Sequence, residues 1–384
     1  RRDLRRGAYR DMEHALDPSC SCHTCKTHSI AYLCHLRATH DSQATQLIGL
    51  HNLHFYMQLM RTMRQHIVAG TWLGFYGAQR DLLDARDCYG PKTRLRSQAV
   101  RKLARLTKGR YEIVIRDDIG RIRDMVSGEV MHSVNDPAEE ARSLYVEQSR
   151  LMERLQVADA APLVIWDVGL GAAANAMATI HAMESIPADQ LRRRLHLVSF
   201  ENDLDSLQLA LRHTRWFKHL RHAAPHQLLE KNQWLSATGS AEWQLLPGDF
   251  VQRKHDAPVP DLVFFDPFSF KTDSALWTVH AFRELAHVCQ HKATELFTYT
   301  YSTSVRAALL AAGFFVAKGC AAGPKLETTI ALSPLATALP HGRELLGAEW
   351  LSRWQRSGAQ APLGAADSDE TWRQAVTGHP QFGG

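Results

Sequence analysis

The sequence predicts an α/β domain with a mostly parallel sheet and helices on both faces, preceded by a small helical metal-binding module. Three observations lead to this fold class. From residue 163 onward, short apolar runs alternate with helical patterns, as parallel strands joined by crossover helices do. The last two runs are joined by a link too short for a helix, so the final strand pair should be antiparallel. Near the start, three cysteines crowd into six residues, a pattern that suits a metal better than a disulfide framework.

Composition limits the class of protein. The chain has 384 residues, of which 45% are hydrophobic and 22% are charged, as in a globular protein long enough for two domains. It contains no long apolar run and no signal-peptide pattern, so we expect a cytoplasmic protein with no membrane partner. The net charge of +5 suits a polyanionic partner without identifying one. Because residue 1 is an arginine, we expect a piece of a longer protein.

Residues 1–87 are predicted to form the metal-binding module. Four candidate ligands lie in it: Cys20, Cys22, Cys25 and His51. Three thiolates and an imidazole complete the tetrahedral shell of zinc without leaving a position for water, which is typical of a structural site. One loop can wrap the three sulfurs around the ion, and a helix predicted over Leu50–Ala69 brings in His51 at its start. The alternative is a set of incidental thiols beside histidines such as His23.

These residues also resemble the C-terminal segment of bacterial tRNA-guanine (queuine) transglycosylases. The resemblance rests on three stretches: Leu16–Cys25, Ser29–Leu33 and Ile48–Arg61. In that family the segment caps a (β/α)8 barrel, uses the matching four residues as zinc ligands and contributes to a homodimer interface. The resemblance therefore implies structural zinc, a homodimer and a barrel upstream of residue 1. Because the barrel carries the catalytic aspartates, this chain is not expected to exchange a base by itself.

Residues 88–105 are basic and turn-rich and are predicted to be a linker that runs into a short helix. A β-hairpin should follow, because Tyr111–Ile115 and Arg121–Met125 alternate around the turn signal of Asp117–Gly120. We expect the glycine of that signal to supply the turn. The hairpin opens the second domain, which is predicted to span residues 106–333.

A helix is predicted from Asp136, which can cap it, to about Leu155. Seven strands should follow: Leu163–Val168, Leu195–Glu201, Glu242–Leu246, Asp261–Asp266, Glu295–Tyr299, Phe314–Lys318 and Glu327–Leu332. Seven strands with an antiparallel end describe the class I (Rossmann-like) methyltransferase topology. Residues 334–384 are predicted to form helices that dock on this domain and then fray.

A glycine-rich turn after the first of these strands is the candidate cofactor site. Its glycines let a ligand approach the backbone just before a helix begins. Glu201 closes the next strand, where a carboxylate can bind both hydroxyls of a ribose, and an aspartate and a phenylalanine close the third, where they can hold an adenine. The candidates are Asp167, Gly169, Gly171, Asn175, Glu201, Asp249 and Phe250. A generic dinucleotide-binding fold is the alternative, and the strand count argues against it.

Residues 106–333 also resemble the methyltransferase domain of the MnmC-type tRNA 5-methylaminomethyl-2-thiouridine enzymes. The marks include Gly128–Ser133, Glu140–Val146, Asn175, Phe200–Glu201, Gly248–Asp249, Asp261–Ser269, Thr298–Thr300 and Gly323–Lys325. The resemblance implies S-adenosylmethionine as cofactor and tRNA as substrate. The sequence departs from the family where Ala173 replaces the usual third glycine of the turn and Pro267 the glycine of an Asp-Gly-Phe motif. The second departure leaves the methyl acceptor open.

Asp266 is the candidate catalytic residue, because it ends the fourth strand beside the cofactor turn and can orient an amine and accept its proton. A carboxylate that only caps the strand end is the alternative. Aromatic side chains should wall the pocket: Phe268, Phe270 and Trp277. Glu129 and His132 close the cleft from the side or end in solvent, two alternatives that the sequence does not separate.

The sequence therefore favours an S-adenosylmethionine-dependent methyltransferase that acts on the aminomethyl group of a wobble uridine, in the anticodon region of tRNA. Bases and an aromatic interleave over Arg212–His222, as in a phosphate-gripping surface, although a solvated helix face explains them equally. No second glycine-rich nucleotide motif follows, so no flavin is expected. The alternatives are a methyltransferase for a small amine or protein acceptor and a non-catalytic tRNA-binding adaptor.

Overall fold

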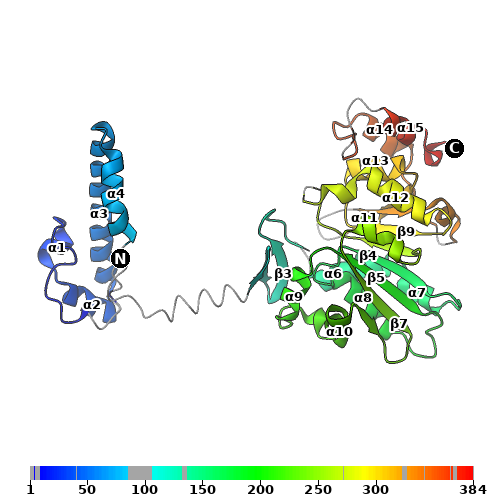
Figure 1. Ribbon diagram of the computed structural model, residues 1–384, viewed down its shortest axis with the longest axis horizontal. Coiled ribbons are helices and arrows are strands. Elements are labelled where there is room, and N and C mark those ends of the chain that lie inside the picture. Colours follow the sequence, from blue (N-terminus) through cyan, green and yellow to red (C-terminus); the bar gives the residue numbers. More distant parts are fainter. Residues whose placement is uncertain are drawn as a thin grey trace. The chain divides into compact units, whose positions relative to one another are not determined.

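The computed structural model describes most of the chain, namely residues 4, 9–39, 41–84, 106–131, 136–270, 272–321, 327–340, 342–363, 365 and 370–383. The chain divides into two compact units, residues 1–102 and residues 103–384 (Figure 1). The linker predicted over 88–105 lies outside the described residues. Among the described helices, none is both long enough and apolar enough to cross a membrane.

The first unit is helical. Its elements are α1 (His23–Thr27), α2 (Ile30–Ala38), α3 (Ser42–Val68) and α4 (Trp72–Asp84). The Asp41 carboxylate accepts a hydrogen bond from the Gln43 backbone N–H (2.8 Å) and caps α3. This cap starts α3 eight residues before the predicted helix over Leu50–Ala69. His51 therefore lies inside α3, and the expectation that it begins a helix was wrong.

One face of α3 is apolar and exposed within the described residues. Its members have exposed fractions between 50% and 62%: Leu50, Leu53, Met57, Met60 and Ile67. They are the residues whose helical spacing predicted the helix. The small core of the unit is made elsewhere, around Tyr9, Ile30 and Leu33. The spacing thus predicted the helix correctly, although these side chains do not form the core of the unit.

The second unit is built on an eight-stranded sheet with the order β10-β11-β9-β8-β4-β5-β7-β6. The strands are β4 (Leu163–Val168), β5 (Leu195–Glu201), β6 (Gln233–Leu235), β7 (Ala241–Pro247), β8 (Leu262–Phe265), β9 (Glu295–Thr298), β10 (Phe315–Gly319) and β11 (Thr328–Leu332). The five from β9 to β7 are parallel, and β11, β10 and β6 are antiparallel to their neighbours. The α/β class and the antiparallel end are as predicted.

Helices cover both faces of this sheet (Figure 1). The central strand β4 shows why: Leu163 and Ile165 belong to one core, while Val164, Trp166 and Val168 belong to the other. On the first face lie α7 (Leu151–Gln156), α8 (Ala174–Glu184), α9 (Asp205–Leu211) and α10 (Ala223–Lys231). On the second lie α11 (Phe250–Arg253), α12 (Val279–Cys289), α13 (Thr303–Ala311), α14 (Ala348–Gln355) and α15 (Thr371–Thr377).

Strand β6 is the eighth strand and was not predicted. It has three residues, of which only Trp234 is buried, and it pairs with the edge of β7. So short a run carries too little alternation to be recognised from sequence. The strand count of seven was therefore one too low.

A separate three-stranded sheet precedes the large one, with β1 (Thr107–Lys108), β2 (Tyr111–Arg116) and β3 (Ile119–Asp124). Arg116 pairs with Ile119, so the hairpin turn is Asp117-Asp118, with φ angles of 53° and 59°. Aspartate tolerates this left-handed region. The expectation that Gly120 supplies the turn was wrong. Gly120 instead lies in β3, where an added Cβ would be 2.6 Å from the buried ring of Phe217.

The helix predicted from Asp136 to Leu155 is interrupted. Asp136 does cap α6 (Pro137–Ala141), but a π-helical turn follows over Arg142–Glu147. Arg150 then adopts a left-handed conformation, with φ of 58°, before α7 begins. The π turn carries Leu144 and Tyr145, which are both buried. Apolar spacing cannot reveal the one-residue shift of hydrogen bonding that makes such a turn.

The C-terminal residues are held against the edge of the large sheet. The Gln381 side chain accepts from the Val316 N–H (2.7 Å) and donates to the Val316 carbonyl (2.8 Å), as a neighbouring strand would. Ala317 of the same edge strand forms an antiparallel backbone bridge with Leu345, and the Lys318 N–H donates to the Glu344 carbonyl (3.0 Å). The prediction that the tail docks is confirmed, whereas the fraying expected at its end is absent from residues 370–383.

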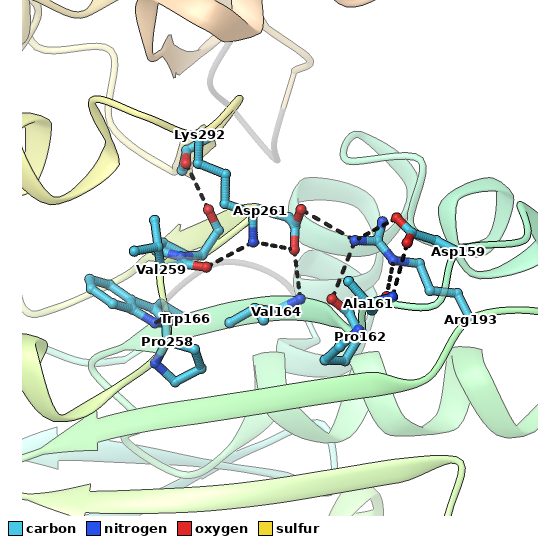
Figure 2. A network of polar contacts seen from close by, with 12 residues as sticks. Asp159, Ala161, Pro162, Val164, Trp166, Arg193, Pro258, Val259, Asp261 and Lys292 are labelled. Atoms are coloured by element: carbon cyan, nitrogen blue, oxygen red, sulfur yellow. Dashed lines mark hydrogen bonds and ion pairs between the residues drawn. The ribbon is translucent and has the colours of Figure 1, made fainter.

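A polar network fixes the amino ends of the central strands (Figure 2). Asp261, just before β8, accepts from the Val164 N–H (2.8 Å), from Lys292 (2.9 Å) and from Arg193 (3.4 Å). Arg193 also donates to the carbonyl of Ala161 (2.9 Å). Because these bonds lock β4 against β8 at one edge, the carboxyl ends of the two strands emerge side by side at the other.

The close packing of Gly120 gives a first prediction. Gly120→Ala should destabilise the second unit by about 1–3 kcal/mol, because the new methyl group meets the buried Phe217 ring. Urea unfolding followed by tryptophan fluorescence measures this, since Trp72 alone of the nine tryptophans lies in the first unit. Gly358→Ala is the matched control, because a Cβ there meets no atom within 4 Å. Equal midpoints for the two variants would contradict the packing argument.

Candidate functional site

The predicted zinc ligands are brought together in the first unit. The ligand atoms of Cys20, Cys22, Cys25 and His51 all lie within 4.8 Å of one another. His51 Nδ1 lies 3.2 Å from the Cys25 sulfur and 3.6 Å from the Cys22 sulfur. A tetrahedral zinc shell places its ligand atoms about 3.5–3.8 Å apart, so the four residues fit a structural zinc ion. Such an ion would hold the cysteine loop and α1 against α3.

The predicted cofactor turn lies at the carboxyl end of β4. Gly169 has a φ of 89°, and a Cβ on it would be 2.7 Å from the Cα of Pro267. Only glycine fits this close approach of two backbones. Ala173, at the usual third glycine, adopts the left-handed region at φ of 57° and precedes α8. The departure from the family pattern at this position therefore leaves the turn geometry intact.

Two acidic side chains lie beside this turn. The half-buried Glu201 ends β5, and its carboxylate accepts from the N–H groups of Gly171 (3.0 Å), Asn202 (2.9 Å) and Asp203 (3.0 Å). Burial raises the pKa of Glu201, against the lowering effect of these bonds. Because Glu201 bonds to the turn itself, its carboxylate lies where a ribose bound at the turn can be reached.

Asp167 is fully buried at the end of β4. Its Oδ2 accepts from the Ser199 hydroxyl (2.8 Å), which in turn accepts from the Trp243 indole N–H (2.9 Å). Burial above all, and then the charges of the nearby Asp266 and Glu201 carboxylates, raise the pKa of Asp167 to about 7, against the lowering effect of the Ser199 bond. Its Oδ1 has no hydrogen-bond partner among the described residues. An acceptor of this kind is available to a ligand N–H group.

Asp266 follows β8, whose carboxyl end lies beside that of β4 and its glycine turn. Its Oδ2 accepts from the side-chain amide of Asn175 (2.8 Å), at the start of α8. Two phenols lie nearby: burial above all, and then the Asp266 charge, raise the pKa of Tyr145 and of Tyr299. The Tyr299 hydroxyl donates to the Pro267 carbonyl (3.4 Å). The site around Asp266 is thus a carboxylate held by an amide and flanked by two neutral phenols.

Tyr145 and Tyr299 were named only as marks of the resemblance, and sequence reasoning did not assign them to the site. Tyr299 follows β9, the strand next to β8, so its place at a carboxyl end could have identified it. Tyr145 comes from the π-helical turn, which the sequence pattern did not reveal.

The predicted aromatic wall is divided between site and core. Phe268 is half-buried and stacks on Tyr111 of β2, with ring centroids 6.4 Å apart. Trp277, at the end of the short helix η5 (Ser274–Trp277), is 1% exposed and donates its indole N–H to the Phe268 carbonyl (2.9 Å). Phe270 is partly buried against the second core. Trp277 therefore supports the Phe268 segment through this hydrogen bond, and Phe268 is the one of the three that stacks on a residue of the hairpin.

Glu129 binds the loop that follows Phe268. Its carboxylate accepts from the Ser269 N–H (2.9 Å), the Ser269 hydroxyl (2.9 Å) and the Thr272 hydroxyl (2.5 Å). These bonds connect the end of the three-stranded sheet to the cleft. The Glu129 carboxylate is therefore bound to a loop of the second unit and does not end in solvent, while a role in closing the cofactor site stays a prediction. His132, the residue predicted to act beside it, lies outside the described residues.

The two residues predicted to bind adenine after β7 differ in burial, because Asp249 is exposed and Phe250 is buried. Asp249 is exposed, and its carboxylate accepts from the Val251 N–H (2.8 Å) as the cap of α11. Phe250 is a core residue with an exposed fraction of 6%, and its ring packs edge-on against Phe200 and Trp166. This packing leaves at most the edge of the ring for a ligand.

The charges around the turn suit S-adenosylmethionine. Three carboxylates lie there, those of Asp167, Glu201 and Asp266, and the charges of the last two raise the pKa of Asp167. Their negative field suits a ligand that carries a sulfonium and an ammonium cation. Two buried acceptor oxygens without partners among the described residues, Asp167 Oδ1 and Asn175 Oδ1, suit its N–H donors. A Cβ at position 169 would fill the close contact that shapes the turn.

The zinc assignment predicts a loss of metal. His51→Ala should lower the zinc content of the purified protein from about one ion per chain to near zero, because three thiolates alone leave the tetrahedral shell open. Metal content by elemental analysis measures this. His54→Ala, one turn further along α3, is the control and should keep its zinc. Full zinc in His51→Ala would refute the ligand set.

Burial of Asp167 predicts a pH effect on stability. The pKa of Asp167 is about 7 in the folded state and about 4 in the unfolded state. Between pH 4 and pH 7 the carboxyl group therefore ionises only in the unfolded state, and the free energy of unfolding falls as the pH rises through this range. Asp167→Asn removes this loss. The stability of the variant relative to the original protein should thus rise by a few kcal/mol between pH 4 and pH 7 and stay level above.

Urea midpoints at several pH values, without cofactor, test this difference. Asp118→Asn in the exposed hairpin turn is the control, and its difference from the original protein should not change with pH. A flat profile for Asp167→Asn would mean that Asp167 is ionised in the folded protein throughout this range.

Comparisons with known proteins divide the chain in the same way as its structure. Residues 1–80 match the family model described as queuine tRNA-ribosyltransferase, and residues 212–334 match the one described as S-adenosyl-L-methionine-dependent methyltransferase. The queuine tRNA-ribosyltransferase of Janthinobacterium sp. (strain Marseille) is 43% identical over 67 residues, which cover 17% of this chain and 18% of that protein.

The second unit has a different relative. The tRNA 5-methylaminomethyl-2-thiouridine biosynthesis bifunctional protein MnmC of Pseudomonas putida is 30% identical over 223 residues, covering 55% of this chain and 33% of that protein. The crystal structure of MnmC2 from Aquifex aeolicus has a TM-score of 0.51 at 20% identity, covering 80% of this chain and 96% of that one. This likeness shows the fold.

The chain spans about a fifth of the length of its queuine tRNA-ribosyltransferase relatives and a third of the MnmC relative. It joins a segment similar to queuine tRNA-ribosyltransferases, which holds the four candidate zinc ligands, to a domain that matches the S-adenosyl-L-methionine-dependent methyltransferase model and is similar to part of MnmC.

Proposed function

We propose that this chain transfers a methyl group from S-adenosylmethionine to the aminomethyl group of a wobble uridine, in the anticodon region of tRNA. The observation that carries the proposal is the group around Asp266, where an amide-held carboxylate and two phenols lie directly beside the cofactor turn. Support for a tRNA substrate comes from both units, since the names of both sets of relatives concern tRNA.

The bound cofactor would supply an electrophilic methyl group. The residues around Asp266 would then have to present a neutral amine with its lone pair aimed at that methyl group. Asp266 can accept one N–H of the amine and, after transfer, take up the proton that the nitrogen must lose. Asn175 holds the Asp266 carboxylate in place through its hydrogen bond to Oδ2. The phenols of Tyr145 and Tyr299 would exclude water around it.

Glu129 would act as a positioning residue in this scheme. Three donors from Ser269 and Thr272 occupy its carboxylate, so it holds the segment that carries Phe268. Phe268, stacked on Tyr111, would then form the wall against which the uracil ring packs. The predicted catalytic set thus separates into one group that handles the proton, one aromatic wall and one loop anchor.

Pro267 replaces the glycine found in the resembling enzymes, so two other acceptors are considered besides the wobble uridine. A small amine or a protein acceptor would use the same group around Asp266. A tRNA-binding adaptor would use none of it. A homodimer formed through residues 1–87 stays a prediction from the resemblance.

Incubation with labelled S-adenosylmethionine and tRNA that lacks the terminal methyl group tests the proposal. Nucleoside analysis should find methylated wobble uridine. Asp266→Asn should lower kcat by about 10²–10⁴-fold at saturating cofactor, because it removes the proton acceptor and retains the contact to Asn175. Cofactor affinity is measured by calorimetry on the same preparations.

Asp256→Asn is the control, because the partly exposed Asp256 pairs with its neighbour Arg253 (2.9 Å) on the surface. It should methylate at the original rate. Label that is transferred in the absence of tRNA would favour a small or protein acceptor, and cofactor binding with no acceptor methylated would contradict the wobble-uridine assignment. Absence of cofactor binding would refute both enzymatic schemes and leave the adaptor.

A further inference from the structure

The loop between α9 and α10 carries a cationic surface that the site around Asp266 does not use. Over ten residues it exposes four cations: Arg212, Arg215, Lys218 and Arg221. The sequence has no acidic residue between Asp205 and Glu230. We call residues 212–222 the cationic loop, because positive charges gather in it with no acidic residue among them.

These cations have no acidic partner among the residues that the structure describes, in contrast to Arg193 and Arg253. Arg193 pairs with Asp159 and Asp261, and Arg253 pairs with Asp256. An unpaired cluster of exposed cations contributes little to the fold and repels itself. Its presence indicates that the loop serves an anionic partner.

The loop has a defined shape. Arg221 donates to the carbonyls of Thr214 (3.0 Å) and Arg215 (3.4 Å), which braces the turn from within. The Trp216 carbonyl accepts from the Gly120 N–H (3.0 Å), which fixes the loop to strand β3. Arg212, Arg215 and Lys218 are thus presented from a supported backbone rather than from a free segment, and this reduces the entropy lost on binding.

An aromatic ring lies among the cations. Trp216 is partly exposed, stacks on His213 with ring centroids 5.5 Å apart, and has the Arg215 guanidinium 6.0 Å from its centroid. Arginine beside a partly exposed indole is suited to nucleic acid, where phosphates meet the cations and bases or riboses meet the ring. An acidic protein surface would pair with the cations without needing to stack on the Trp216 ring.

The loop is also adjacent to the cofactor turn. The imidazole Nε2 of His219 lies 3.0 Å from the carbonyl of Ala172, within the turn that begins at Gly169. The hydroxyl of Ser206, near the start of the helix α9 that leads into the loop, donates to the Gly171 carbonyl (3.0 Å). A polyanion bound along the loop would therefore approach the carboxyl edge of the sheet, where Glu201 and Asp266 lie.

We propose that the cationic loop binds the phosphate backbone of the RNA substrate and holds it beside the cofactor cleft. The proposal rests on tRNA being the substrate, as argued above. Arg212, Arg215 and Lys218 would contact phosphates, Arg221 would keep the loop in shape, and Trp216 would stack on an unpaired base or a ribose. Binding through such contacts depends steeply on salt, because each neutralised phosphate releases a counterion.

Titration of an unmodified tRNA transcript into the full chain, at several salt concentrations, tests the proposal. Arg215→Ala/Lys218→Ala should weaken binding roughly tenfold or more and lower the slope of log Kd against log salt by about 2, one for each lost phosphate contact. The matched control is Arg192→Ala/Arg194→Ala, which removes two exposed arginines at the amino end of β5, the opposite edge of the sheet. The control should keep both affinity and slope.

Calorimetry with S-adenosylmethionine on both double variants checks that the cleft is intact, and equal cofactor affinities are expected. Unchanged tRNA affinity in Arg215→Ala/Lys218→Ala would overturn the proposal and favour an acidic protein as the partner. Equal loss in the control would also overturn it, because net charge alone would then account for binding. Selective loss of binding, in a protein that methylates no uridine, would support the loop and refute the wobble-uridine assignment.

Discussion

The close approach of Gly169 to Pro267 is the contact on which the rest of the second unit depends. Two neighbouring parallel strands, β4 and β8, end side by side, and their following backbones come so near that a single methyl group would not fit between them. The Asp261 network fixes the same two strands at the opposite edge of the sheet. Because both ends are fixed, the carboxylates of Asp167, Glu201 and Asp266 converge on one turn.

That convergence explains the electrostatics of the cleft. A charged carboxyl group as buried as that of Asp167 is usually paired with a cation. Here two further acids, Asp266 and Glu201, lie near it instead. Such an arrangement destabilises the empty protein and stabilises a complex with a cationic ligand. Exposed cations gather beside the cleft rather than in it, along residues 212–222. Under the proposed function, the negative charges would face a cationic cofactor and the positive charges an anionic substrate.

The first unit follows a different physical logic. Its small core around Tyr9, Ile30 and Leu33 buries little apolar surface, and four ligand atoms that fit zinc join the cysteine loop to α3. Metal binding can supply the stability that a core of this size does not. The apolar face of α3 that begins at Leu50 remains exposed in the described residues.

Buried features were the easiest to predict from the sequence. The central strands β4 and β5 were predicted residue for residue, because strands covered on both faces are continuous apolar runs. The clustering of Cys20, Cys22 and Cys25 with His51 was predictable because close spacing of cysteines has few other causes. Edge strand β6 and the π-helical turn were missed, since neither changes the apolar pattern enough to be seen.

Roles set by tertiary packing were beyond the sequence. Gly120 was assigned to a turn because glycine is common in turns, and its real constraint is the ring of Phe217, almost a hundred residues later in the chain. The same holds for Glu129, whose three donors come from Ser269 and Thr272, and for Phe250, whose ring the core covers. Local patterns carry no information about partners that distant in sequence.

The most direct test of this account is calorimetric titration of S-adenosylmethionine into the full chain and its Glu201→Gln variant. The account predicts one binding site per chain, with affinity reduced about tenfold or more in the variant because a neutral amide binds the ribose hydroxyls less strongly than a carboxylate. The control Glu153→Gln changes an exposed side chain of α7 and should bind S-adenosylmethionine as tightly as the original protein does. No heat of binding, or equal affinity in Glu201→Gln, would contradict the claim that the acids around the glycine turn form a cofactor site.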